Sequence, residues 1–517
     1  MRYVSGLLLP FILVTGVVWA QSPFDSGQPF KPAGAIDEKV LAVLQKKGIT
    51  PSNQCSDEVF VRRVYLDVIG TLPTSTEADA FLKDQKPNKR ALLIDALLQR
   101  DEFGQYWGLK WGDLLRVKSE FPIKLWPNAV QAYDHWIRDA VAKNMPYDQF
   151  VRALLTSSGS NFRVPPVNFY RGVQDRSPVG LASAVALTFM GTRLDKWPET
   201  MRNQMATFFS RVAYKSTGEW KEEIVYPDPT KTDALPVVFP DGSKLTVPAG
   251  KDPREVFTDW LLAPDNVWFS RAIANRVWYW LMGRGIIHEP DDIRSTNLPV
   301  NPELLAYLQK ELVGAKYDVR HLFRLILNSA TYQQSSIPSS KQPEVEAHFG
   351  VYPVRRLDAE VLIDALCWLG GDGQGYCSQV PEPFTWIPEN QRAITIMDGS
   401  ITSAFLEMFG RPPRDTGLES ERNNQSSDAQ ELYLLNSVDM HQKVQRSKMF
   451  AKFTMDAKGD RATLVGSLYL AILSRRPTEA ELAAADKHFQ TPGLAQKQAV
   501  DDLAWALINS KEFLFRH

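Results

Sequence analysis

The chain has 517 residues, of which 44% are hydrophobic and 23% are charged, as in a globular protein of roughly two to four domains. Its 59 basic residues nearly balance its 60 acidic ones, which gives a net charge of −1. This balance excludes a general nucleic-acid binder and a polybasic membrane-surface protein, because both classes carry a basic excess.

Residues 1–20 have the pattern of a cleavable secretory signal. Arg2 supplies a charged start, an apolar run follows from Leu7 to Trp19, and Val18-Trp19-Ala20 forms a small-x-small cleavage site before Gln21. The run is shorter than the ~20 residues that cross a bilayer. We therefore expect a periplasmic, secreted or cell-surface protein with no membrane span after cleavage; the alternative is an uncleaved anchor helix.

Residues 36–215 are predicted to form a first helical domain. Ser56 is placed to cap a helix that ends at Gly70. Aromatic and apolar residues recur at helical spacing over 103–115, and we interpret this stripe as core rather than as a ligand platform. The run Pro178 to Gly191 is apolar nearly all round, which indicates a central buried helix.

Residues 216–252 are predicted to form a small β-containing connector. Residues 219–226 alternate like a strand, and residues 237–247 have an Asp241-Gly242 turn between two apolar runs, which is typical of a β-hairpin. Residues 253–517 then return to helical patterns, interrupted by a long irregular segment at 370–396. The expected fold is mainly α, with two helical domains joined by this β element.

The cysteines are Cys55, Cys367 and Cys377. In an oxidising compartment Cys367 and Cys377, which flank a glycine-rich turn, either form a disulfide or stay as free thiols, and spacing alone does not decide between the two. No Cys-x-x-Cys pair occurs. This excludes zinc sites built on such pairs, thioredoxin-like chemistry and covalently attached c-type haem.

Several strings carry a resemblance to a known pair of families. They are Phe60–Asp67, Asn144–Val151, Arg271–Trp278, Phe409–Arg414 and Asn509–Phe513. In this order they resemble the paired domains of unknown function DUF1549 and DUF1553, the planctomycete cytochrome-associated and planctomycete-specific domains of exported proteins. The resemblance covers essentially the whole mature chain.

The resemblance implies a role in electron transfer. This chain, however, lacks the residues that such a role requires. Many relatives carry a Cys-x-x-Cys-His haem motif after a Phe-x-Gly string, whereas here Phe189–Gly191 is followed by residues 192–198 without Cys or His. Relatives also often carry a cysteine pair where Leu418 and Ser420 stand here. We therefore expect no haem and no other cofactor.

One polar cluster, at residues 288–294, suggests a catalytic site. It contains the candidate catalytic residues His288, Glu289, Asp291 and Asp292, followed by Arg294. Neighbouring carboxylates can push their pKa values apart and so provide an acid and a base. The alternative is a helix-capping loop tied down by Arg294. His-x-x-x-His and EF-hand spacings are absent, so no metal site is predicted.

Arginines form the second kind of cluster. The candidate ligand-binding residues are Arg355, Arg356, Arg411, Arg414 and Arg422. Guanidinium groups bind carboxylate, sulfate or phosphate in a bidentate manner, and these groups occur on acidic and sulfated polysaccharides. The alternative is internal pairing, for example with Glu419 or Glu421, and Asp358 is expected only to cap a helix. Residues Trp268 and Trp278–Trp280 either stack on sugars or, as their helical spacing favours, pack in the core.

The sequence leaves the function open between different classes. We find no nucleophile elbow, phosphate-binding glycine loop, zinc-protease motif or dinucleotide fingerprint. The favoured hypothesis is a non-catalytic exported scaffold that binds a partner protein or an anionic surface polysaccharide. The alternative is a glycan-active hydrolase or lyase, and a weaker one is an accessory protein of electron transfer. Convergence of Asp291, Asp292, Arg411, Arg414 and Glu419 in one open cleft would favour the enzyme.

Overall fold

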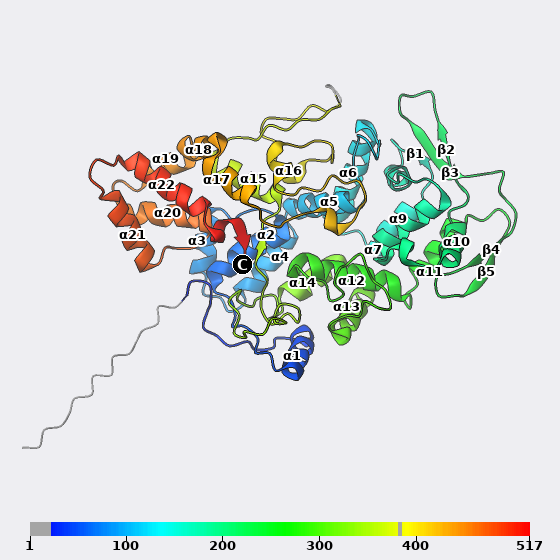
Figure 1. Ribbon diagram of the computed structural model, residues 1–517, viewed down its shortest axis with the longest axis horizontal. Coiled ribbons are helices and arrows are strands. Elements are labelled where there is room, and N and C mark those ends of the chain that lie inside the picture. Colours follow the sequence, from blue (N-terminus) through cyan, green and yellow to red (C-terminus); the bar gives the residue numbers. More distant parts are fainter. Residues whose placement is uncertain (1–21, 381–384) are drawn as a thin grey trace, which may run out of the picture.

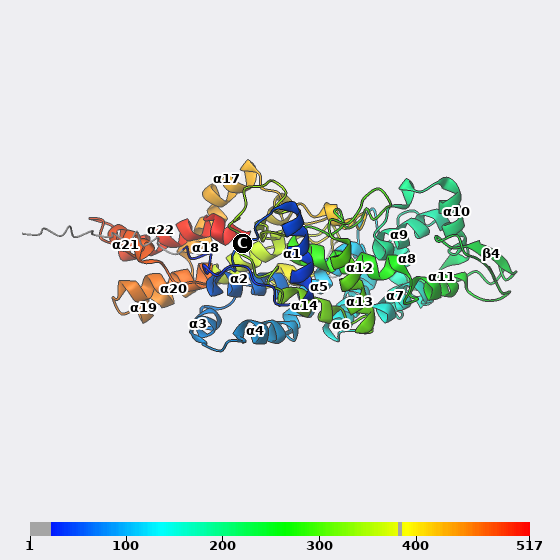
Figure 2. The ribbon, with the colours of Figure 1, turned by 90° about the horizontal axis from the view of Figure 1, so that it is seen from below.

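The computed structural model describes residues 22–380 and 385–517, so the predicted signal at 1–20 lies outside the described residues. The protein is mainly α-helical and elongated, with the small β-strands β1–β5 at one end and helices α19–α22 at the other (Figure 1). Seen from below, it is flatter, and α2, α5, α12 and α14 occupy its middle (Figure 2).

The helices follow the predicted order in both halves. The first half contains α1 (Ala35–Lys47), α2 (Asp57–Ile69), α3 (Ser75–Lys83), α4 (Lys89–Leu98), α5 (Asp101–Leu114), α6 (Pro127–Ala142), α7 (Tyr147–Thr156), α8 (Asn168–Arg171), α9 (Pro178–Met190) and α10 (Glu199–Thr207), with 3₁₀ turns η1 (Pro165–Val167) and η2 (Leu194–Lys196).

The second half is also helical, apart from loops and two short strands. It contains α11 (Pro253–Leu261), α12 (Val267–Met282), α13 (Pro302–Gly314), α14 (Val319–Leu327), α15 (Ala359–Gly370), α16 (Ala404–Met408), α17 (Asp428–Asn436), α18 (Val438–Gln445), α19 (Lys448–Asp456), α20 (Arg461–Leu473), α21 (Glu479–Phe489), α22 (Gln496–Ile508) and α23 (Lys511–Leu514), with 3₁₀ turns η3 (Ala393–Thr395) and η4 (Glu419–Glu421).

Local signals explain where helix α2 begins and ends. The Ser56 side chain accepts a hydrogen bond from the backbone of Val59, which satisfies an otherwise free N–H at the helix start. Gly70 ends the helix with a φ of 60°, a conformation that costs glycine little. A Cβ at this position would also lie 2.6 Å from the ring of Tyr106, so a close approach to α5 requires glycine as well.

In the described part of the chain, the strands form three small antiparallel sheets. One has the order β1-β3-β2, another pairs β4 with β5, and the third pairs β6 with β7; the strands are β1 (Gly159–Ser160), β2 (Val212–Ser216), β3 (Glu223–Pro227), β4 (Leu235–Val238), β5 (Lys244–Val247), β6 (Arg355–Arg356) and β7 (Phe515–Arg516). The hairpin β4-β5 confirms the predicted Asp-Gly turn, with Val237 opposite Leu245. The first sheet also contains β1, which lies within the first half of the chain. The β-structure is therefore not confined to the predicted connector at 216–252.

The two halves share one hydrophobic core. Buried residues of α2, α5 and α9 belong to the same cluster as those of α12, α14 and α15. Helix α9 is buried as expected and packs against α12. Arg63 of α2 also connects the two halves by hydrogen bonds, because its guanidinium donates to the carbonyl oxygens of Tyr332 (2.7 Å) and His517 (2.8 Å). Within residues 22–380 and 385–517, no helix is long and apolar enough to span a membrane.

Candidate functional site

A charged cleft of about 670 Å³ lies where the two halves meet. Helix α5 contributes one wall, the C-terminal end of α12 another, and the paired strands β6 and β7 with η4 and the segment 422–426 complete it. Among the described residues, its charged lining comprises five cations and two carboxylates: Lys110, Arg355, Arg356, Arg422, Arg516, Asp358 and Glu419. The volume suits a few sugar-sized units.

Asp358 is the most heavily bonded group of the cleft. It occupies the N-cap position of α15, but its carboxylate makes no capping hydrogen bond. Oδ2 accepts hydrogen bonds from Tyr106 (2.7 Å), Lys110 (2.9 Å) and Arg516 (3.1 Å), and Oδ1 accepts one from Asn424 (2.6 Å). The prediction that Asp358 only caps a helix is therefore wrong, because the buried cations around it require a counter-charge.

Opposing effects set the pKa of the Asp358 carboxyl. Burial alone would raise it, but Lys110, Arg516 and Arg422 outweigh burial and hold the pKa well below its ordinary range. The same environment acts on Lys110, whose pKa is lowered by burial and by the nearby Arg422. Asp358 is therefore a permanently ionised anchor of the cleft at neutral pH.

The cations around the cleft outnumber the carboxylates that they contact. Four carboxylates each form ion pairs with at least two cations. The pairs are Asp67 with Arg355 and Arg516, Asp113 with Arg414 and Arg422, Glu360 with Arg411 and Arg422, and Asp358 with Lys110 and Arg516. Among the described residues, no carboxylate lies within ion-pair distance of Arg356, which donates to the carbonyl of Phe409 and to Gln430. The cleft therefore keeps an excess of positive charge.

Glu419 differs from Asp358 because one of its oxygens is free. Oε1 accepts a hydrogen bond from Trp280 Nε1 (2.8 Å) and lies 3.5 Å from Arg276 Nε. Oε2 has no hydrogen-bond partner in the part of the chain that the structure describes. Burial and the nearby Asp291 raise the pKa of the carboxyl to about 7, against the opposing effect of Arg276. The pKa of this carboxyl is therefore raised from its ordinary value toward neutrality.

The predicted catalytic cluster at 288–292 does not converge. Asp291 is buried, with Oδ1 2.6 Å from Arg276 Nη2, and its Oδ2 accepts from the backbone of Glu419 (2.7 Å). Asp292 pairs with Arg294 at 3.2 Å. Glu289 is exposed and pairs with Arg193, and His288 is exposed. Adjacent side chains in this irregular loop point in different directions, so only Asp291 reaches the site, behind Glu419.

The predicted ligand-binding arginines divide into two groups. Arg355, Arg356 and Arg422 line the cleft. Arg411 and Arg414 lie behind it: the exposed fraction of Arg414 is 0%, and its guanidinium contacts Asp113 at 2.8 Å. Arg411 donates to the carbonyl of Asp398 at 3.0 Å. These two arginines are internally paired because carbonyls and carboxylates surround them, and they do not face a ligand.

The three cysteines lie in described residues and carry free thiols. Cys367 on α15 accepts from Lys443 Nζ at 3.6 Å, and the Cys377 thiol lies 3.6 Å from the carbonyl of Thr402. The disulfide considered from the sequence is therefore not formed in the structure, because the two side chains have partners in separate elements.

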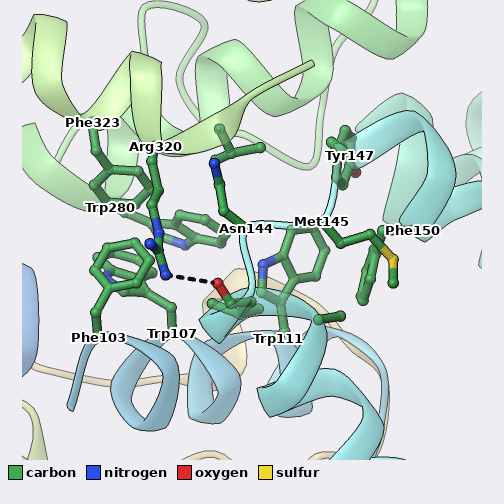
Figure 3. Close-up of a pocket in the computed structure, with 13 residues that line it drawn as sticks. Phe103, Trp107, Trp111, Asn144, Met145, Tyr147, Phe150, Trp280, Arg320 and Phe323 are labelled. Atoms are coloured by element: carbon green, nitrogen blue, oxygen red, sulfur yellow. Dashed lines mark hydrogen bonds between the residues drawn. The ribbon is translucent and has the colours of Figure 1, made fainter. Parts of the chain in front are cut away.

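A second, apolar cavity of about 50 Å³ adjoins the cleft. In Figure 3 the aromatic side chains of α5, including Trp107 and Trp111, face Trp280 and Phe323, and Arg320 closes one side by donating to the carbonyl of Val141 (3.1 Å). Trp107 and Trp280 line both hollows, with ring centroids 5.0 Å apart. The aromatic stripe is therefore core, as predicted, and also forms the wall between cavity and cleft.

The other polar depressions and side-chain clusters that the structure describes lack the charge excess of the cleft. A depression of about 860 Å³ near residues 22–28 has nearly balanced charges, with five cations and four carboxylates in its lining. Within residues 22–380 and 385–517, no group of three or more His, Cys, Asp or Glu side chains is arranged to hold a metal ion. Of the aromatic residues considered for sugar stacking, Trp278 is buried in the core, whereas Tyr279 and Trp280 line the cleft.

Sequence reasoning missed Lys110, Arg516 and the role of Asp358. Tyr106 and Lys110 are four residues apart on α5 and so share one face. A lysine within an aromatic stripe can either lie at the protein surface or face a polar site, so its position in the sequence does not identify the cleft. Arg516 reaches the cleft through the pairing of β7 with β6, in which Arg355 lies opposite it.

Two family models match successive parts of the chain. Residues 35–220 match the family described as protein of unknown function (DUF1549), and residues 253–489 match the one described as protein of unknown function (DUF1553). No curated protein and no solved structure matched the chain. The chain belongs to the paired DUF1549/DUF1553 family.

Proposed function

We propose that this protein binds an anionic polysaccharide, carrying sulfate or carboxylate groups, in the charged cleft. The excess of cations over carboxylates in the cleft is the observation that carries the proposal. Because Asp358 and the carboxylates behind the cleft are each shared between cations, the guanidinium and ammonium groups retain attraction for a further anion. Tyr279 and Trp280 add aromatic surface beside these charges, and the concave shape fits a sugar chain better than a broad protein interface.

Export is part of the same proposal. Residues 1–20 carry the charged, apolar and small-residue pattern of a secretory signal, and an exported protein would meet surface polysaccharides. We expect the N-terminus of the protein isolated from its native host to be Gln21, in the periplasmic or extracellular fraction. N-terminal sequencing checks this, and Met1 in the cytosolic fraction would contradict it.

Binding is tested by calorimetric titration of the protein with dextran sulfate, polygalacturonate and neutral dextran. We expect the two anionic polymers to bind and neutral dextran not to, with affinity falling as salt rises because screening weakens charge attraction. Equal binding of charged and neutral polymers, or no binding of any, would overturn the proposal.

A charge change at the rim of the cleft gives a sharper test. Gln425 is exposed and lines the cleft. Gln425→Glu preserves the size of the side chain and adds a negative charge, so it should weaken dextran sulfate binding by roughly three- to tenfold. Gln425→Lys, the matched control, should strengthen it. Unchanged affinity in both variants would place the ligand elsewhere.

A further inference from the structure

We propose that the cleft is also catalytic, and that Glu419 cleaves a bound polyuronate by β-elimination, acting first as base and then as acid. This inference rests on the proposed function, because it requires an anionic sugar chain in the same cleft. It goes beyond binding by assigning a reaction, a substrate class and a proton-transferring residue.

The geometry favours Glu419 for proton transfer. Turn η4 places it on the lining of the cleft, and the exposed fraction of its side chain is 13%. Trp280 and Arg276 fix Oε1, so the free Oε2 is the atom available to a substrate. The charged groups around the carboxyl are Arg276, Asp291 and Lys110, and with burial they bring its pKa to about 7. A group poised near the working pH is suited to serve as both base and acid.

The cleft fits elimination better than hydrolysis. A glycosidase of the usual kind needs two available carboxyl groups. Among the described residues, only two carboxylates line this cleft, and Asp358 already accepts four hydrogen bonds from Tyr106, Lys110, Arg516 and Asn424. Elimination needs one proton-transferring group together with cations that neutralise the uronate carboxylate, and both are present here.

The reaction needs no second reactant. Oε2 of ionised Glu419 takes the proton from C5 of a uronate, whose acidity rises when cations neutralise the C6 carboxylate. The C5–H electron pair forms the C4=C5 double bond, and the bond between C4 and the glycosidic oxygen breaks. That oxygen receives the proton from Glu419. The products are a chain with a new hydroxyl end and a chain that ends in a 4,5-unsaturated uronate, and Glu419 is regenerated.

The test is incubation of the full mature chain with polygalacturonate, alginate and dextran sulfate, followed by ultraviolet absorbance of the conjugated C=C–carboxylate product. Because one group acts as both base and acid, the C5 proton and the C4 oxygen must lie on the same face of the sugar. We therefore expect product from the mannuronate units of alginate and none from polygalacturonate or dextran sulfate. Glu419→Gln should reduce the rate at least roughly 100-fold and leave calorimetric binding within about threefold. Its amide oxygen can still accept from Trp280, and an unchanged thermal midpoint verifies folding. Glu303→Gln, an exposed site on α13, should behave as wild type.

The pH profile provides an independent readout. Because the base must be ionised, kcat/KM should fall as pH decreases below about 7. Alginate binding without unsaturated product, reducing ends without the ultraviolet signal, or full activity of Glu419→Gln would each overturn this inference and leave the binding proposal standing. Absence of binding by any anionic polymer would instead remove the proposed function on which it rests.

Discussion

Replacing Asp358 with alanine is expected to lower the free energy of unfolding by about 3–5 kcal/mol. Its carboxylate is 2% exposed and is the shared partner of Lys110 and Arg516. Alanine would leave two buried cations short of a counter-charge, and the remaining Asp67 already serves Arg355 as well as Arg516. The cost comes mainly from these uncompensated charges rather than from the lost contacts.

Denaturant unfolding of wild type and variant measures this loss. Asp292→Ala is the matched control, because Asp292 forms a half-exposed pair with Arg294 and should cost under about 1 kcal/mol. Asp358→Asn retains the shape if alanine prevents folding altogether, and it should still destabilise. Equal stability of Asp358→Ala and Asp292→Ala would show that Lys110 and Arg516 do not depend on the Asp358 carboxylate as their counter-charge.

The stabilisation that the Asp358 carboxylate provides depends on pH. The pKa of Asp358 is held well below its ordinary value in the folded protein, whereas in the unfolded chain it is about 3.9. Its stabilising contribution is therefore complete above roughly pH 4 and is lost as pH falls through the folded-state pKa. The stability difference between wild type and Asp358→Ala should shrink in acid, at pH values below about 4.

The sequence predicted those parts of the fold that depend on neighbouring residues. The cap at Ser56, the left-handed Gly70 and the Asp241-Gly242 turn each act within a few positions, and the structure confirms all three. The mainly helical class follows from many such signals together. The position of Asp358 at the start of α15 was likewise correct.

The site depended on contacts that no local pattern contains. Tyr106 and Lys110 meet Asp358 across 252 and 248 positions of the chain, so its carboxylate turns away from the helix that it begins. The opposite error occurred at 288–292, where adjacency in sequence suggested convergence. Neighbours in an irregular loop need not share a face, and Asp291 alone is drawn inward, by the buried Arg276.

Replacing Trp107 with alanine is also expected to cost about 3–5 kcal/mol, because it removes a large buried ring that its surroundings cannot replace. The ring centroid lies 4.6 Å from that of Phe323 and 5.0 Å from that of Trp280, and Nε1 donates to the carbonyl of Val68 (2.9 Å). Since Trp107 separates the apolar cavity from the cleft, its loss should also weaken anionic polymer binding by disturbing Trp280.

Two variants separate these contributions. Trp107→Phe keeps an aromatic ring but leaves the Val68 carbonyl without its donor, so it should fall between wild type and alanine, with a loss of about 1–3 kcal/mol. Trp386→Ala removes a tryptophan that is 67% exposed and should change stability by no more than about 0.5 kcal/mol. Denaturant unfolding measures the order of the unfolding free energies of these variants, and calorimetry measures their affinity for dextran sulfate. If Trp107→Ala were as stable as Trp386→Ala, the ring at 107 would not be part of the shared core, and the wall between cavity and cleft would have to be formed by other residues.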